Sequence, residues 1–230
     1  ASRWVSLASE QVGQLINATP ESIVYTSGAT EANNLAIFGV ADFYQHRGRH
    51  LICGATEHAS VITPMQQLQR RGYDLTLLQP DSNGIIDPDA LSAAIRKDTV
   101  LVSIQHANNE TGALQNIAEL ADRVHQQHTL LHVDAAQSMG KTAVDVIAMN
   151  CDLLALSGHK IYGPKGIGAL YIRRKPRIQL TPQLFGGGQQ ASLRPGTLPT
   201  QQIAGLGKAC EIAAEQLTNE QKHLWQLHHQ

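Results

Sequence analysis

Short, mostly apolar segments alternate with longer segments of helical spacing along most of this chain. The apolar runs are typical of buried strands, and they cover residues 23–26, 50–53, 74–78, 99–103, 130–134, 152–156 and 169–172. Strands of this kind, separated by helices, are typical of a parallel sheet with both faces covered. The alternation therefore predicts the α/β class, with a mostly parallel sheet and helices on both faces.

The segments between these strands show the 3.6-residue period of amphipathic helices. Helices are predicted over 2–16, from the turn at 27–31 to about 47, and over 56–68, 87–96, 117–128 and 199–230. Residues 173–198 are rich in Arg, Pro and Gly, so we expect a long ordered loop there. The predicted division is a large domain over 1–198, followed by one long helix over 199–230.

Composition narrows the class of protein. The formal net charge of the 230 residues is −1, so no basic field indicates a nucleic acid or a membrane surface as partner. No apolar run is long enough to span a bilayer. The chain has three cysteines, far apart in sequence, which predicts neither a disulfide framework nor a cysteine zinc site. We therefore expect a reducing, cytoplasmic setting.

Polar residues follow the ends of several predicted strands. In an open α/β sheet the ligand binds outside the carboxyl ends of the strands. The polar residues at these positions are Ser27, Glu57, His58, His106, Asn108, Asn109, Asp134, Gln137, Ser157, His159 and Lys160. Several polar turns at one edge of the sheet predict a binding site there.

Lys160 follows the apolar run that ends at Leu156 and precedes a glycine-rich segment. A lysine buried at such a strand end loses its proton more readily, because burial disfavours the ammonium. The neutral amine is the form that makes a Schiff base. A lysine near glycines is also commonly a solvated loop residue, so both interpretations stay open at this point.

Two other features meet the needs of the same chemistry. The N–H groups of Ala29 and Thr30, in a predicted strand-to-helix turn, would face an anion. Asp134, at the end of an apolar strand, costs free energy unless it is paired. Ordinary capping is the alternative for each. With Lys160 they form the set that pyridoxal 5′-phosphate (PLP) requires: an amine, a carboxylate for the pyridine nitrogen, and donors for the phosphate.

Rival sites have weaker support. The sequence has neither the glycine-rich dinucleotide motif nor the P-loop motif. His46 and His50, and also His128 and His132, have the i, i+4 spacing of a two-histidine zinc site. However, the first pair spans Gly48, and His132 lies on a predicted strand. No metal site is therefore predicted.

Ordered motifs along nearly the whole chain resemble those of the class V aminotransferase-like cysteine desulfurases, and most closely the NifS/IscS group. The motifs are Thr26-Ser-Gly-Ala-Thr-Glu31, Glu57-His58, His106-Ala-Asn-Asn-Glu-Thr-Gly112, His132-Val-Asp-Ala-Ala-Gln137, Ser157-Gly-His-Lys-Ile-Tyr-Gly-Pro-Lys-Gly166 and Arg194-Pro-Gly-Thr-Leu198. The resemblance implies the large PLP-binding domain of a homodimeric, fold-type I enzyme.

The resemblance also implies a role for individual residues. Lys160 would bond covalently to PLP, Asp134 would pair with the pyridine nitrogen, and His58 would stack on the ring and act in acid–base chemistry. Gln137 and Asn108 would lie near the phenolic oxygen. The phosphate would be held by Ala29, Thr30, Ser157 and His159, and across the dimer by Thr197.

The implied reaction takes sulfur from L-cysteine, leaving L-alanine and an enzyme persulfide that serves iron–sulfur scaffold or other sulfur-acceptor proteins and tRNA thiolation. In this family the persulfide cysteine and the carboxylate-binding arginine lie in a C-terminal domain. Because the chain begins without Met and stops within a predicted helix, we expect it to be truncated at both ends and inactive alone. A selenocysteine lyase, a cysteine/cystine lyase, another class V enzyme and a non-catalytic PLP-binding fragment remain alternatives.

Overall fold

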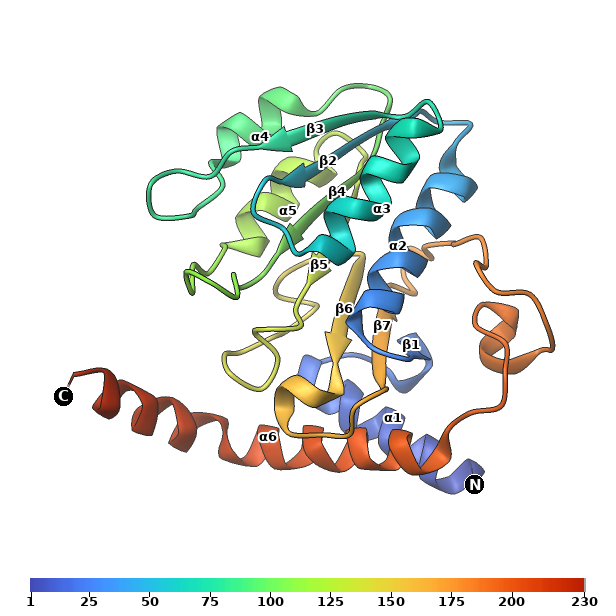
Figure 1. Cartoon of the computed structure of the whole chain (residues 1–230), viewed down its shortest axis with the longest axis vertical. Helices are drawn as coiled ribbons and strands as arrows, with labels where there is room; N and C mark the ends of the chain where they lie inside the picture. The colour runs from blue at the N-terminus through green and yellow to red at the C-terminus, as the bar shows by residue number, and fades with distance from the viewer. Residues whose placement is uncertain (230) are drawn as a thin grey trace.

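A seven-stranded sheet runs through the computed structural model, which describes residues 1–229 (Figure 1). Its strands, in spatial order, are β1 (Ile23–Thr26), β7 (Gly168–Ile172), β6 (Leu153–Ser157), β5 (Leu130–Asp134), β4 (Thr99–Gln105), β2 (His50–Gly54) and β3 (Asp74–Leu78). Strand β7 is antiparallel to both of its neighbours, and the other pairs are parallel. The predicted mostly parallel sheet is confirmed, and each strand lies where an apolar run predicted it.

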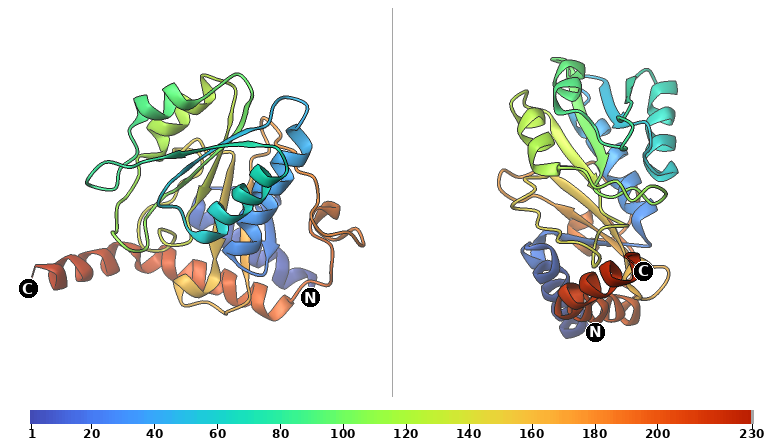
Figure 2. Two further views of the ribbon diagram at one scale, coloured as in Figure 1. Left: turned by 45° about the horizontal axis from the view of Figure 1, so that its top comes forward. Right: turned by 90° about the vertical axis from the view of Figure 1, so that its left-hand side faces the viewer.

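Helices cover both faces of the sheet, as predicted (Figure 2). One face carries α2 (Ala29–Tyr44) and α3 (Ala59–Arg70), which share an apolar core with β2 and β4. The other face carries α1 (Ser2–Ile16), α4 (Pro88–Ala94), α5 (Ile117–His125) and α6 (Thr200–His228), which share a second core. Each core is closed by helices whose apolar residues recur at helical spacing.

Helix α5 shows how the sequence pattern produces one of these elements. Ile117, Leu120, Ala121 and Val124 are buried at the spacing of one helix face. The Asn116 side chain caps the helix by accepting from the N–H of Glu119. The helix ends at His125 and not at the expected residue 128, because the chain then reverses in a turn with a positive φ at His128. Helices α2 and α4 also end earlier than predicted.

The expected loop at 173–198 is long and ordered, with a short 3-10 helix η3 (Gln189–Ser192). The side-chain amide of Gln190 pairs with the free edge of β1. Its Oε1 accepts from the N–H of Tyr25 at 2.6 Å, and its Nε2 donates to the carbonyl of Tyr25 at 2.9 Å. One side chain thus satisfies edge groups that a further strand would otherwise bond.

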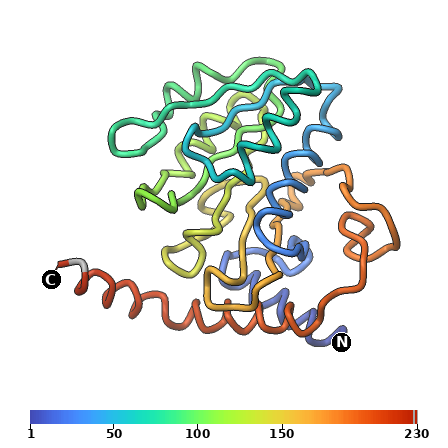
Figure 3. Tube along the Cα trace, in the orientation of Figure 1, coloured from blue at the N-terminus to red at the C-terminus, as the bar shows by residue number. Residues whose placement is uncertain are grey.

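Helix α6 runs along the edge of the molecule beside α1, and its C-terminal part extends away from the sheet (Figure 3). In its first half, Ile203, Leu206 and Cys210 are buried in the same core as α1. Within the part of the chain that the structure describes, no helix has the length and apolarity needed to cross a membrane.

The contact between α1 and α6 depends on Gly207. A Cβ placed at this position would lie 2.6 Å from the Cα of Ala8 and 2.7 Å from its Cβ. We expect Gly207→Val to lower the free energy of unfolding by about 1–3 kcal/mol through overpacking, measured by urea denaturation. The same substitution at exposed Gly188, where a Cβ would meet nothing within 4 Å, is the control. Equal losses in the two variants would refute close packing at Gly207.

Candidate functional site

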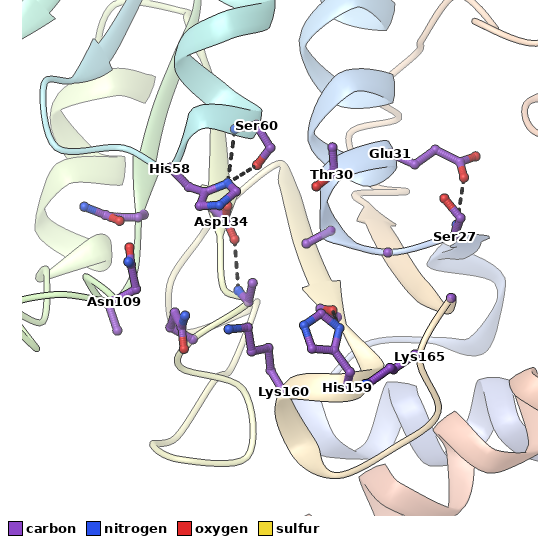
Figure 4. A pocket seen from close by; sticks show the side chains of 18 residues that line it. Ser27, Thr30, Glu31, His58, Ser60, Asn109, Asp134, His159, Lys160 and Lys165 are labelled. Carbon is purple, nitrogen blue, oxygen red and sulfur yellow. Dashed lines mark hydrogen bonds between the residues drawn. The ribbon is translucent and has the colours of Figure 1, made fainter.

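A pocket of about 580 Å³ lies at the carboxyl ends of the central strands (Figure 4). It is lined by groups from the ends of β4, β5 and β6 and from the first turns of α2 and α3. The residues predicted for the site that line this pocket are Ser27, Ala29, Thr30, His58, Asn109, Asp134, Gln137, Ser157, His159 and Lys160. These predicted residues thus lie around one pocket.

The N-terminus of α2 forms one wall. The turn that leads into it passes close over β7, where a Cβ on Gly168 would lie 2.7 Å from the Cα of Gly28. The first-turn N–H groups of a helix have no intrahelical acceptors, so those of Ala29 and Thr30 suit an anion. These two residues also line the pocket. Glycine at position 168 thus lets the anion-binding turn come close to the sheet.

Glu31 fixes this turn from both sides. Its Oε2 accepts from the N–H of Ser27 at 2.7 Å, and its Oε1 accepts from Nε of Arg194 at 2.7 Å. Burial alone would raise the pKa of Glu31, but the hydrogen bonds from Arg194 and Ser27 outweigh it, and the pKa is lowered. The loop after β7 is thereby tied to the start of α2.

Asp134 is the buried carboxylate of the site. Its Oδ1 accepts from the N–H of Ala136 at 2.9 Å, and its Oδ2 accepts from Nδ2 of Asn33 at 2.8 Å. Burial raises the pKa of Asp134, and these two hydrogen bonds only partly oppose it. A cationic ligand group beside the carboxylate would lower the cost of burying its charge.

Ser157 and His159 lie beside each other at the end of β6, where Ser157 Oγ and His159 Nδ1 are 2.9 Å apart. The 3-10 helix η2 (Gly158–Ile161) follows at once and carries His159 and Lys160 into the pocket. Of the two interpretations left open for Lys160, burial is wrong: the residue is exposed, although it lines the pocket. The reason is local, because β6 ends at Ser157 and the 3-10 turn leads the next residues out of the core.

Asn108 and Thr197 do not line the pocket. The Oδ1 of Asn108 accepts from the N–H groups of Glu110 and Thr111, and its Nδ2 donates to the carbonyl of Thr56 at 3.2 Å. Asn109, the next residue, lines the pocket instead. Thr197 lines a separate hollow.

Sequence reasoning missed Asn33 and Ser60: Ser60 lines the pocket, and Asn33 on α2 lies behind it. Asn33 is fully buried on α2, and its Nδ2 donates to Ser60 Oγ as well as to Asp134, at 2.8 Å in each case. Ser60 Oγ lies 2.7 Å from Nδ1 of His58. The sequence could have indicated Asn33 as a residue near the site, because it lies one helical turn after Ala29 and Thr30 and therefore on the same side of the helix. Nothing in the sequence indicated Ser60.

The remaining histidines near the sheet have packing roles. His50 lies between Thr99 Oγ1 at 2.7 Å and Thr76 Oγ1 at 2.9 Å, and His132 Nδ1 lies 2.8 Å from Ser103 Oγ. Burial lowers the pKa of His106 to about 4 and that of His132 to about 3. Among residues 1–229, no three His, Cys, Asp or Glu side chains are grouped as a metal site.

The Glu31–Arg194 pair gives a pH-dependent prediction. The folded-state pKa of Glu31 lies below its ordinary value of 4.5, so its contribution to stability is complete above that value and is lost as the pH falls through the folded pKa. We expect Glu31→Gln to lower the free energy of unfolding by about 1–2 kcal/mol at neutral pH. In urea titrations this difference should shrink at acid pH, whereas exposed Glu21→Gln should cost little at any pH. A Glu31→Gln loss that persists at acid pH would contradict the ion pair.

Comparison with known proteins gives consistent matches. The aminotransferase class-V family model matches residues 1–230. Cysteine desulfurase IscS of Vibrio cholerae serotype O1 is 53% identical over 227 residues, which are 99% of this chain and 56% of that protein. The chain thus spans about half the length of the curated relatives it matches.

Comparison with solved structures gives matches to the same group of proteins. A NifS-like protein superposes with a TM-score of 0.95 at 35% identity, covering 99% of this chain and 62% of the other. A structure described as SspA in complex with cysteine has a TM-score of 0.88 at 43% identity, covering 91% of this chain and 60% of the other. The predicted resemblance to the NifS/IscS group is confirmed. With its whole length matched by the family model, this chain belongs to the class-V aminotransferase family.

Proposed function

We propose that this chain is the PLP-binding part of a cysteine desulfurase, which takes sulfur from L-cysteine and leaves L-alanine and an enzyme persulfide. The observation that carries the proposal is the meeting of three groups in one pocket. The Lys160 amine, the buried Asp134 carboxylate and the N-terminus of α2 come from distant parts of the chain. Their chemistry is the set that PLP needs.

The residues present fit this cofactor. Asp134 accepts from two neutral donors, the N–H of Ala136 and the amide of Asn33. A protonated pyridine nitrogen would supply the positive charge that a buried carboxylate lacks there. The turn at Ala29 and Thr30 supplies N–H donors of the kind that bind a phosphate. Ser157 and His159 add a hydroxyl and an imidazole in the same pocket.

Bound PLP would supply an electron sink for the bonds at the α-carbon of an amino acid. Lys160 would hold the cofactor through its amine and, once free, move the α-proton of the substrate at Nζ. Asp134 would keep the ring nitrogen protonated through its carboxylate. Gln137 would lie beside the phenolic oxygen, and the α2 N-terminus would fix the phosphate.

None of the cysteines in the sequence is suited to carry the persulfide. Cys53, Cys151 and Cys210 are buried, and burial raises the pKa of each thiol to about 12. The attacking species in such chemistry is the thiolate. The proposal therefore assigns the persulfide to a cysteine outside these residues.

The proposal extends to the arrangement of the whole protein. Residues 1–198 would form the PLP domain, and 199–230 would lead toward a C-terminal domain. A homodimer would let Thr197 reach the phosphate of the partner subunit, which agrees with its place outside its own pocket. The sulfur would pass to iron–sulfur scaffold or other acceptor proteins in the cytoplasm. The three free cysteines agree with a reducing compartment.

Covalent capture of PLP tests the cofactor assignment. The chain is mixed with PLP and treated with borohydride, and the labelled peptide is located by mass spectrometry. We expect stable label at Lys160 and none in Lys160→Ala, because the Lys160 amine is the proposed attachment point. Lys165→Ala removes another lysine that lines the pocket and should leave the labelling unchanged. Label that follows Lys165, or that persists in Lys160→Ala, would overturn the assignment.

Thiol titration tests the conclusion about the cysteines. We expect a thiol reagent such as DTNB to react negligibly with the folded chain and with three thiols after unfolding in denaturant. With PLP and L-cysteine, no persulfide should form on Cys53, Cys151 or Cys210. A persulfide on any of them, located by mass spectrometry, would contradict their structural role.

A further inference from the structure

The side-chain amide of Asn33 connects two residues that line the pocket, Asp134 and Ser60. Asn33 lies on α2 and is fully buried. Its Nδ2 carries two N–H donors. One reaches Asp134 Oδ2 at 2.8 Å, and the other reaches Ser60 Oγ at 2.8 Å. Both donors of Asn33 are therefore engaged, each with a residue that lines the pocket.

The Ser60 hydroxyl passes this constraint on to His58. Its oxygen accepts from Asn33, so its own hydrogen is free to point at the remaining neighbour, Nδ1 of His58, at 2.7 Å. The backbone N–H of Ser60 also donates to His58 Nδ1, at 3.1 Å, which makes the imidazole the N-cap of α3. Two donors thus face Nδ1, and a hydrogen on Nδ1 would point at both donors and prevent both hydrogen bonds.

The carboxylate of Asp134 determines which group donates in each hydrogen bond of the series Asp134–Asn33–Ser60–His58. Asp134 Oδ1 already accepts from the N–H of Ala136. A carboxylate accepts and does not donate, so it selects the NH₂ end of Asn33. The carbonyl oxygen of Asn33 has no hydrogen-bond partner among the described residues. The amide is therefore oriented by its two donors and not by its acceptor.

We propose that Asn33 is a positioning residue that, through the Ser60 hydroxyl, fixes neutral His58 as the tautomer with its hydrogen on Nε2. Because Nδ1 faces Ser60, the Nε2–H of His58 is the group left for the pocket that this histidine lines (Figure 4). His58 then offers a hydrogen-bond donor to a bound ligand and is not a base at Nε2. The pocket is thereby suited to a ligand that presents an acceptor, such as a carboxylate or phenolate oxygen, to this ring.

This inference deepens the proposed function, since it concerns a residue of the same pocket, but it can be tested without cofactor. The protonation of each ring nitrogen of His58 is read from long-range ¹H–¹⁵N correlation spectra of the ¹⁵N-labelled full chain, recorded where the imidazole is neutral. The signals of His58 are identified by their loss in His58→Gln. We expect hydrogen on Nε2 and none on Nδ1. Failure of PLP labelling would leave this result intact, so the two proposals stand or fall separately.

Variants then test the path through Ser60. Asn33→Ala releases the Ser60 hydroxyl, which can turn to accept from His58, so the population with hydrogen on Nδ1 should rise several-fold. Ser60→Ala keeps the backbone N–H at Nδ1 and should remain on the Nε2 tautomer. The double variant should match Ser60→Ala alone, because the proposed effect of Asn33 on the His58 tautomer runs only through that hydroxyl.

Control variants separate this role from a purely structural one. Asn34→Ala, on the same helix, removes only a bond to the carbonyl of Thr30 and should leave the tautomer unchanged. Asn33→Ser, which cannot donate to both acceptors, replaces Asn33→Ala if that variant does not fold. Hydrogen on Nδ1 in the unaltered chain would overturn the proposal. So would an unchanged tautomer in a folded Asn33 variant, or an Asn33 effect that persists in the double variant.

Discussion

The buried carboxylate of Asp134 is the constraint on which the rest of the pocket depends. It lies at the end of β5, where the core meets the open edge of the sheet, and it is 6% exposed. A charge placed there needs donors on every free side. The backbone N–H of Ala136 and the amide of Asn33 provide two, and a ligand cation would complete the set. Helix α2, which packs on the sheet through its apolar face, carries Asn33 to this carboxylate.

The loop after β7 holds the anion-binding end of the pocket in a similar way. Gln190 satisfies the edge of β1, and Arg194 binds Glu31 at the first turn of α2. Each contact joins residues that are far apart in sequence, and both contacts lie near the turn at Ser27 and Gly28. The wall of the site at the start of α2 is therefore held by the loop after β7 as well as by the contacts of the pocket residues themselves.

The sequence predicted most of the fold because the signals there are local. Apolar runs found every strand, and the topology rule that ligands bind outside strand ends brought Asp134, Ser157 and Lys160 to one pocket. The failures concern geometry that local patterns do not encode. The exposure of Lys160 depends on where the 3-10 turn leaves the core.

The choice between Asn108 and Asn109 depends on one residue of register in a turn, so it could not be read from the sequence. The Asn33–Ser60 contact joins two helices and therefore required the tertiary structure. Roles assigned through resemblance, such as that of Thr197, concern a second subunit and lie beyond the fold of one chain.

A crystal structure of this chain with PLP would test the central claim most directly. We expect the phosphate at the N-terminus of α2, beside Ser157 and His159. The ring nitrogen should face Asp134, with continuous electron density from the cofactor to Lys160 Nζ. A cofactor bound elsewhere, or one turned so that its ring nitrogen points away from Asp134, would contradict the account.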